Sequence, residues 1–312
     1  MTSAFFSCLT FTRRDFHSIS SCVSPISRRE LQQHIDRLLA ARECVLVHRS
    51  VHDILTSLDL VVSRFLDPSS RERQEAEAHL PEETGLSPEM IRHTLPLLFA
   101  EYRREQLLTA IDDELGSRKI LDEFTPFASG MRKAQGSPLV THVLAGNIPG
   151  AGIDGVLFTL LVKSAALVKT ASTASLLPTL FARALTHVDP DLGACVSVVT
   201  WPGGQTELED VAFSRADVVV ASGSAESLAA IRARVRGRLI GYGHKISFNV
   251  IAKEALSNNV EGLARRAAYD IALFDQQGCL SPQLLYVEEG GVIPPKAFAA
   301  RLAQGLQYWQ QE

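Results

Sequence analysis

The chain has 312 residues, of which 46% are hydrophobic and 21% are charged, and its formal net charge is −4. This composition is typical of a globular protein of about two domains, and it excludes a disordered, fibrous or membrane-spanning chain. The near-neutral charge, without a basic stripe, argues against a nucleic-acid binder or a polybasic membrane anchor.

The first 27 residues are rich in Ser, Thr and Phe without periodicity, and we expect a poorly ordered lead-in. Residues 12–16, Thr-Arg-Arg-Asp-Phe, resemble a twin-arginine export signal. The following residues are polar and interrupted by Pro25, so the apolar region that export requires is missing. The longest apolar stretch, residues 156–168, is interrupted by Lys163 and Ser164, and it is shorter than the roughly 18 residues of a membrane span.

Residues 28–121 show helical periodicity, with apolar side chains three to four residues apart, as at Leu31, Ile35 and Leu38. Ser69 and Glu72 have the spacing of a capping box, and Pro88 after Ser87 indicates another helix start. The first third of the chain is therefore predicted to be a helical layer.

After Gly136-Ser137-Pro138, short β-rich runs alternate with helical stretches. The expected strands are residues 141–145, 166–170, 195–201, 217–222 and 238–242, and the expected helices are residues 153–163, 174–187, 205–213 and 225–235. Such alternation predicts right-handed crossovers and a parallel sheet covered on both faces. This is a nucleotide-binding type of α/β architecture, in which ligands lie at the carboxyl ends of the strands.

A shorter unit follows, with strands expected at residues 246–252 and 284–288 and helices at residues 260–274 and 295–311. We therefore divide the chain into the lead-in 1–27, a cofactor-binding domain 28–245 that includes the N-terminal helices, and the start of a catalytic domain at 246–312. About 65 residues make a small domain by themselves. We expect this second domain to be incomplete, as in a truncated or partial protein.

The five cysteines predict neither a disulfide framework nor a zinc site, because they are widely spaced and form no Cys-x-x-Cys pair. They are Cys8, Cys22, Cys44, Cys195 and Cys279. A reducing cytoplasm fits this usage best. His48 and His52 have i, i+4 spacing without an acidic third ligand, which favours a solvated helix face, and no metal is predicted.

Gly150, Gly152 and Gly155 match the Gly-x-Gly-x-x-Gly pattern of dinucleotide-binding proteins between an expected strand and helix. The next strand ends in Lys169, where such proteins place an acidic ribose ligand, and a lysine suits a ribose or a 2′-phosphate. A glycine-rich turn that only packs a helix on a sheet is an equally good interpretation.

Cys279 follows Gly278 between a helix end and a strand, a context that exposes the sulfur and the backbone N–H together, as an acyl-transfer nucleophile requires. The alternative is a buried structural cysteine. Asn147, after the first strand, would donate to a developing oxyanion or serve as a turn residue before Pro149. The turn Ser222-Gly223-Ser224 would hold a phosphate or only cap a helix.

Together these runs resemble the aldehyde dehydrogenase superfamily, and more closely its acyl-CoA reductase branch, the fatty acid reductase of bacterial bioluminescence. The resemblance covers about residues 30–312. It implies that Cys279 is the nucleophile, Asn147 the oxyanion donor and Lys169 a contact of the adenosine ribose, and that residues 222–224 form the cofactor-phosphate turn. In this superfamily the glycine pattern lies beside the catalytic Asn and does not hold the pyrophosphate.

Two departures from the superfamily pattern qualify the resemblance. Oxidising members carry a general-base Glu four residues before the lysine that matches Lys245, where this chain has Gly241. Without that base, water is poorly activated to attack an acyl-enzyme, which implies thioester reduction. Members of the superfamily also continue well past the nucleophile, and their remaining residues form the far wall of the substrate tunnel.

The resemblance implies NADPH-dependent reduction of a long-chain fatty acyl thioester to the aldehyde, with NADH as the alternative cofactor. Acyl-CoA or an acyl-carrying protein is the expected substrate, an acyl-transferring enzyme the expected partner, and a homo-oligomer the expected state. Two other interpretations stay open at this point: a non-catalytic remnant of the fold, and a CoA-acylating aldehyde dehydrogenase.

Overall fold

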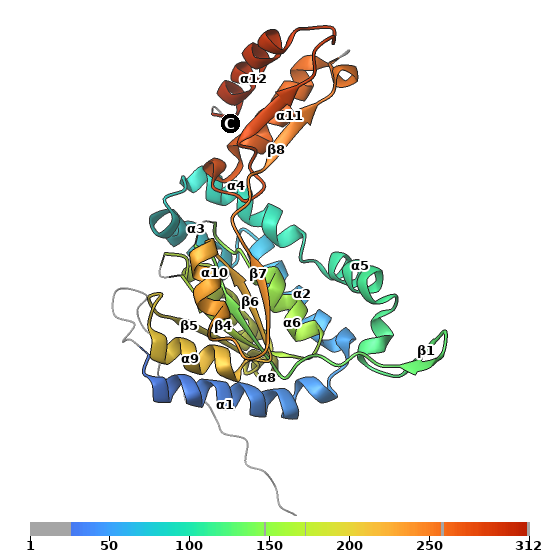
Figure 1. The fold of residues 1–312 in the computed structure, drawn as a ribbon, viewed down its shortest axis with the longest axis vertical. Coiled ribbons are helices and arrows are strands. Elements are labelled where there is room, and N and C mark those ends of the chain that lie inside the picture. The colour runs from blue at the N-terminus through green and yellow to red at the C-terminus, as the bar shows by residue number, and fades with distance from the viewer. Residues whose placement is uncertain (1–25, 147, 172, 257–258, 311–312) are drawn as a thin grey trace, which may run out of the picture.

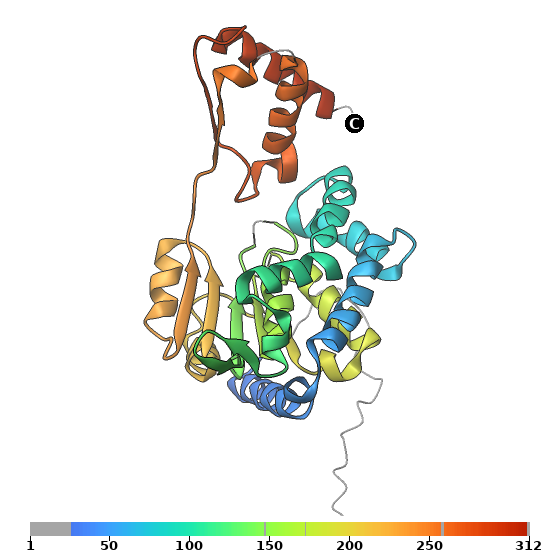
Figure 2. The same cartoon turned by 90° about the vertical axis from the view of Figure 1, so that its right-hand side faces the viewer.

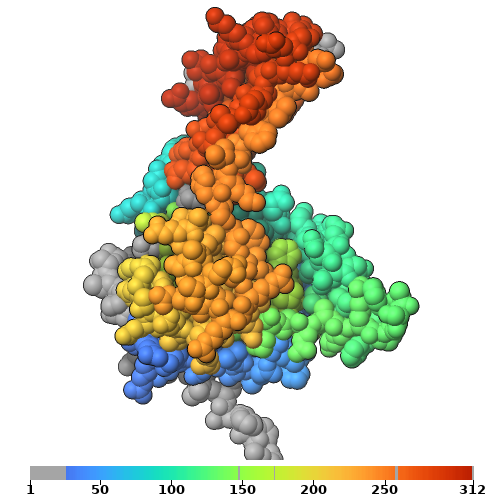
Figure 3. Space-filling model, in the orientation of Figure 1, coloured from blue at the N-terminus to red at the C-terminus, as the bar shows by residue number. Residues whose placement is uncertain are grey.

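A computed structural model of the chain describes residues 26–146, 148–171, 173–256 and 259–310. The proposed lead-in and the twin-arginine resemblance lie almost wholly outside the described residues. Most of the described chain forms one α/β body, and the last 65 or so residues form a second unit joined to it by a narrow junction (Figure 3).

The body is built on a five-stranded sheet in the order β5-β4-β3-β6-β7, in which every neighbouring pair is parallel. Its strands are β3 (Leu139–Val143), β4 (Ala165–Thr170), β5 (Val196–Thr200), β6 (Val218–Ser222) and β7 (Arg238–Tyr242). The strand order reverses between β3 and β6, which is where α/β sheets of this type bind their ligands. The predicted parallel sheet is therefore present, with β3 two residues earlier than expected.

Helices cover both faces of this sheet, as the alternating pattern predicted (Figure 1). One apolar cluster joins Ala166 and Val168 to α2, α6 and α7, and the other joins Leu167 to α1 and α9. These helices and their connections are α1 (Arg28–Cys44), α2 (Val51–Leu66), α6 (Ile153–Leu161), α7 (Leu176–Val188), α8 (Pro190–Gly193), α9 (Thr206–Arg215) and α10 (Ala225–Arg232).

Serine caps begin four of the helices in the N-terminal layer, which also contains α3 (Arg71–Thr84), α4 (Pro88–Ala100) and α5 (Arg104–Leu115). The cap of α3 is Ser70, so the prediction of a capping box at Ser69 is wrong. Ser69 instead binds Asp67, and Glu72 pairs with Arg64 at 2.9 Å, which leaves no carboxylate for the box.

A two-stranded antiparallel hairpin, β1 (Thr125–Phe127) with β2 (Gly130–Arg132), was not predicted. Three-residue strands are too short for an alternating pattern to be recognised, and Pro126 argues against a strand. The hairpin projects from the body (Figure 1), and its residues Phe127 and Met131 are exposed.

The second unit contains a parallel pair of strands, β8 (Phe248–Ile251) and β9 (Leu284–Val287), packed against α11 (Val260–Ala272) and α12 (Pro295–Trp309). The helix expected at residues 260–274 ends at Ala272, and the 3-10 turn η4 (Leu273–Gln276) follows it. Figure 2 shows this unit beyond the carboxyl ends of the five strands. Its η4 segment contacts α4 of the body. No helix in the described part of the chain is long and apolar enough to cross a membrane.

Candidate active site

At the carboxyl edge of the large sheet, Lys169 and Ser222 lie on β4 and β6, the two strands that flank β3. Lys169, the penultimate residue of β4, pairs with Val143 of β3, and Val143 pairs with Ala221 on β6, next to Ser222. Both predicted cofactor contacts therefore lie where the strand order reverses. Their roles stay predictions.

Lys169 is partly buried, with its ammonium 5.9 Å from the centroid of the Trp201 ring. Burial lowers the pKa of Lys169, against the opposing influence of the Glu209 carboxylate. Among the described residues, no carboxylate lies within ion-pair distance of this ammonium, and the buried Trp201 Nε1 has no hydrogen-bond partner. A cation without a carboxylate partner at this edge fits the hydroxyl-rich ribose of a nicotinamide dinucleotide.

The turn after β6 forms the predicted helix cap, and its predicted role in holding a phosphate stays a prediction. Ser224 caps α10, because its Oγ accepts a hydrogen bond from the Ser227 N–H at 3.1 Å. The Gly223 N–H donates to the Tyr242 carbonyl at 3.1 Å, which fixes the turn against the neighbouring strand. The side chain of Ser224 is thus already used, and a phosphate would meet the backbone N–H groups of the first turn of α10.

The glycine-rich run before α6 packs the chain tightly. Gly150 and Gly152 have left-handed φ angles of 77° and 91°, and a Cβ at either position would lie 2.5 or 2.4 Å from a leucine side chain. At Gly155 a Cβ would lie 3.0 Å from the ring of His142. This geometry favours the packing interpretation of the pattern over a phosphate cradle.

Cys279 lies in the loop between η4 and β9 as an exposed free thiol. The Ser247 hydroxyl donates to the Cys279 carbonyl at 2.6 Å, and the Ser281 hydroxyl donates to the Leu273 carbonyl at 3.1 Å. A Cβ on Gly278 would lie 2.9 Å from the Ser281 Oγ, so glycine lets the loop close on itself. Hydrogen bonds thus fix the loop around an exposed cysteine.

Several predicted features are not brought together by the described residues. Asn147 lies outside them, so the proposed oxyanion site stays a prediction. In the described chain, no hydrogen bond, ion pair or ring contact joins Cys279 to Lys169 or to the turn 222–224.

His48 and His52 fall on different elements, and His52 Nδ1 lies 2.7 Å from a guanidinium nitrogen of Arg104, which favours the predicted solvated surface over a metal site. The residues described contain no cluster of three or more metal-ligating side chains.

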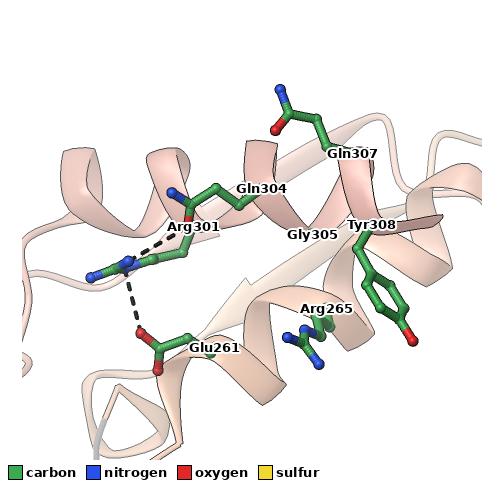
Figure 4. Close-up of a pocket in the computed structure, with 7 residues that line it drawn as sticks. All are labelled: Glu261, Arg265, Arg301, Gln304, Gly305, Gln307 and Tyr308. Carbon is green, nitrogen blue, oxygen red and sulfur yellow. Dashed lines mark hydrogen bonds and ion pairs between the residues drawn. The ribbon is translucent and has the colours of Figure 1, made fainter. Parts of the chain in front are cut away.

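A groove of about 310 Å³ lies between α11 and α12 (Figure 4). Its side chains include Arg301, which is 3.6 Å from Glu261, and Arg265, which lies over the Tyr308 ring. None of the predicted site residues lines it.

The model of one protein family, described as acyl-CoA reductase (LuxC), matches residues 46–312. The chain belongs to this family. A long-chain acyl-protein thioester reductase from Photorhabdus laumondii is 34% identical over 185 residues, which cover 58% of this chain and 38% of that protein. Another protein of that name, from Aliivibrio fischeri, is 27% identical over 248 residues, covering 77% of this chain and 51% of that one. The chain thus spans about half, or less, of the length of these relatives.

Solved aldehyde dehydrogenase structures share the fold of this acyl-CoA reductase family member. The aldehyde dehydrogenase of Pseudomonas aeruginosa superposes with a TM-score of 0.72 at 14% identity, covering 92% of this chain and 56% of that one. A glyceraldehyde-3-phosphate dehydrogenase from Methanocaldococcus jannaschii, complexed with NADP, gives a TM-score of 0.68 at 12% identity, covering 91% and 60%. The predicted aldehyde dehydrogenase-like α/β fold and the predicted family are therefore confirmed.

Two residues near the predicted site of this family member were not identified from the sequence. Trp201 contacts the Lys169 ammonium from the end of β5, and Met90 of α4 contacts Phe274, in the turn that precedes the Cys279 loop. Nothing in the sequence places residues 90 and 274 together. For Trp201 the sequence offered a signal, since this residue ends the predicted strand 195–201 at the edge where ligands lie.

Proposed function

We propose that this chain reduces a long-chain fatty acyl thioester to the aldehyde through an acyl-enzyme on Cys279. The observation that carries the proposal is an exposed, free cysteine on a hydrogen-bonded loop, in a chain that belongs to the acyl-CoA reductase family. The relatives' names support a long-chain acyl thioester as the substrate class. Acyl-CoA and an acyl-carrying protein present the same thioester, and an acyl-transferring enzyme is the proposed donor.

In the first step, the Cys279 thiolate attacks the thioester carbonyl carbon. A bond forms between Sγ and that carbon while the carbonyl electrons move to oxygen, where the Asn147 amide and the Cys279 N–H are the proposed donors. The carbon–sulfur bond to the carrier then breaks, and the carrier thiolate takes up a proton. The product is an acyl thioester on Cys279.

In the second step, the acyl group is reduced and leaves. A reduced nicotinamide, when bound, supplies the hydride. Lys169 and the turn at residues 222–224 are proposed to hold the adenosine ribose and phosphate, and the unpaired ammonium supports this role. Cys279 is then expelled as a thiolate while the carbonyl of the aldehyde forms. NADPH is the proposed cofactor.

Gly241 directs the acyl-enzyme toward reduction in this proposal. The residue lies on β7 beside Ala221, and it carries no carboxylate to deprotonate water. An acyl-enzyme without a nearby general base is hydrolysed slowly, so it persists until the hydride arrives.

A homo-oligomer in the cytoplasm is the proposed setting. The β1–β2 hairpin supports self-association, because Phe124, Phe127 and Met131 are all more than half exposed on a projecting ribbon with unpaired edges. Free thiols at Cys44, Cys195 and Cys279 support a reducing compartment.

The test measures aldehyde formed and NADPH oxidised when the protein is mixed with palmitoyl-CoA, with NADH in a parallel reaction. We expect one aldehyde per NADPH with the natural chain, none with Cys279→Ala, and the natural rate with Cys44→Ala, which removes the other exposed thiol of the described residues. Fatty acid as the product, or a folded protein that forms no aldehyde with either cofactor, would contradict the proposal. The second result would favour a non-catalytic protein.

A further inference from the structure

Residues 273–283 carry Cys279 and are called the nucleophile loop below, and they are attached to a helix of the N-terminal layer. The backbone N–H of Phe274 donates to the Met90 Sδ at 3.3 Å, although the two residues are 184 positions apart. Met90 lies in the first turn of α4, and both residues pack against the large core cluster of the body. The turn at the start of this loop therefore packs against the core of the body.

A second contact joins the same face of α4 to the C-terminal unit. His93 Nε2 lies 2.8 Å from the Tyr269 hydroxyl of α11, and the two rings meet edge to face with centroids 5.6 Å apart. Met90 and His93 are three residues apart, so they lie on one side of the helix. Helix α4 thus holds both the end of α11 and the turn that follows it.

That turn is strained. Phe274, Asp275 and Gln276 have φ angles of 55°, 50° and 61°, a left-handed conformation that is unfavourable for residues with a Cβ. Three such residues in succession persist only where the surroundings hold them, and strain of this kind concentrates at functional sites.

The strained turn is mechanically connected to Cys279. The Gln277 N–H donates to the Phe274 carbonyl at 2.9 Å, and the Ser281 N–H donates to the Gly278 carbonyl at 3.0 Å. The Phe274 ring lies 3.6 Å from the point where a Cβ on Gly278 would stand. A displacement of Phe274 is therefore passed on to Gly278 and to the cysteine that follows it.

We propose that Met90 and Phe274 are positioning residues for Cys279, through which helix α4 fixes the nucleophile loop over the carboxyl edge of the cofactor-binding sheet. The role of Cys279 in this statement rests on the proposed function. Met90 supplies an acceptor and apolar contact, and Phe274 carries the strained turn into the core. Neither residue touches the reacting atoms.

The test uses the full chain with Met90→Ala, Met90→Leu and, as a control on the same helix, Leu97→Ala, whose side chain is 43% exposed. Hydrogen exchange is measured over residues 273–283 and over β3 and β6. Met90→Ala is expected to speed exchange in the loop by about tenfold and to leave β3 and β6 unchanged. Met90→Leu, which keeps the bulk and loses the acceptor, is expected to have a smaller effect, and Leu97→Ala none.

The second readout is the rate of Cys279 acylation by palmitoyl-CoA. In Met90→Ala the limiting rate should fall by about tenfold or more, with less than about a twofold change in the half-saturating concentration. Iodoacetamide labelling of Cys44 should not change. A variant that only loosened the fold would instead alter the exchange of β3 and β6.

The outcomes separate this inference from the proposed function. If the natural chain is not acylated, the proposed function fails, and the exchange data still test the anchor. Unchanged loop exchange in both Met90 variants would overturn the inference even where the natural chain is acylated. Acylation of Met90→Ala at the natural rate would overturn it as well.

Discussion

The two parallel sheets of this chain differ in what covers them. The five-stranded sheet has an apolar cluster on each face, whereas β8 and β9 are covered on one face only. On the bare face, alternate residues are between 51% and 65% exposed: Phe248, Val250, Leu284 and Tyr286. Parallel strands are normally buried on both faces. The large sheet meets this rule, whereas the small sheet lacks cover on one face.

The two units also differ in the size of their apolar core and in which proposed site residues they carry. The third apolar cluster holds five buried residues, and the proposed nucleophile lies in that unit. The proposed cofactor contacts lie on the well-covered sheet. We infer that the small unit depends on its few core residues and on helix α4, while the large sheet is stable by itself.

The largest effect is expected from Phe298→Ala, which removes the fully buried aromatic side chain of the third cluster. Such a truncation costs about 3–5 kcal/mol, more than so small a cluster can lose, so the unit should open while the large sheet stays folded. Proteolysis should cut after residue 245 before it cuts the body. Leu306→Ala, at a partly exposed position on the same helix, is the control. A single cooperative loss of both units would refute the separation.

Acid should weaken the large sheet through His142. The imidazole is buried on β3 against Thr159, and burial lowers its pKa from 6.5 to about 4. The unfolded chain therefore binds a proton at a pH where the folded chain does not. The full free energy of unfolding is therefore present above pH 6.5. Roughly 3 kcal/mol of it is lost as the pH falls from 6.5 to about 4.

Urea denaturation of the large sheet between pH 7 and pH 4 would measure this loss. His142→Gln keeps a hydrogen-bonding side chain without the titration, so its free energy of unfolding should fall less over the same range. Equal pH dependence in the two proteins would show that His142 is not the responsible group.

Lys169→Ala should weaken NADPH binding by about tenfold, because an ammonium at the edge of the sheet is lost. Lys253→Ala, which removes an ion-paired lysine of the small unit, should leave binding unchanged. Fluorescence titration of both variants distinguishes a specific contact from a general charge effect. Similar affinities in the two variants would remove Lys169 from the cofactor site.

The smallest effect is expected at the bare face of β8. Val250 is 65% exposed, so Val250→Ser should change the free energy of unfolding of the small unit by less than about 0.5 kcal/mol. Exchange of the β8 amides reports this value. A loss above about 1.5 kcal/mol would show that another surface covers this face in solution.

The sequence predicted the order of strands and helices in the large sheet because apolar runs such as residues 165–170 are long and evenly spaced. It missed the hairpin at residues 125–132, whose strands are too short for periodicity, and it misplaced the cap of α3 by one residue. The proposed nucleophile and cofactor lysine come from local context together with family resemblance.

The anchor between Met90 and Phe274 could not be predicted. A hydrogen bond between residues 184 apart depends on tertiary packing, and the left-handed turn at residues 274–276 contains no glycine that would signal it. The glycine-rich run before α6 has the spacing of a dinucleotide fingerprint, and its residues alone left a packing turn equally open. The leucine side chains packed against Gly150 and Gly152 favour the packing turn, as the family resemblance implied.

The intact mass of the protein after mixing with palmitoyl-CoA, without nicotinamide, tests the central claim most directly. We predict that one palmitoyl group is added, that peptide mapping places it on Cys279, and that it disappears when NADPH is added. Cys279→Ala should gain no mass, while Cys44→Ala should behave like the natural chain. A folded natural chain that gains no acyl group, or gains it on another residue, would contradict the assignment of Cys279 as the nucleophile.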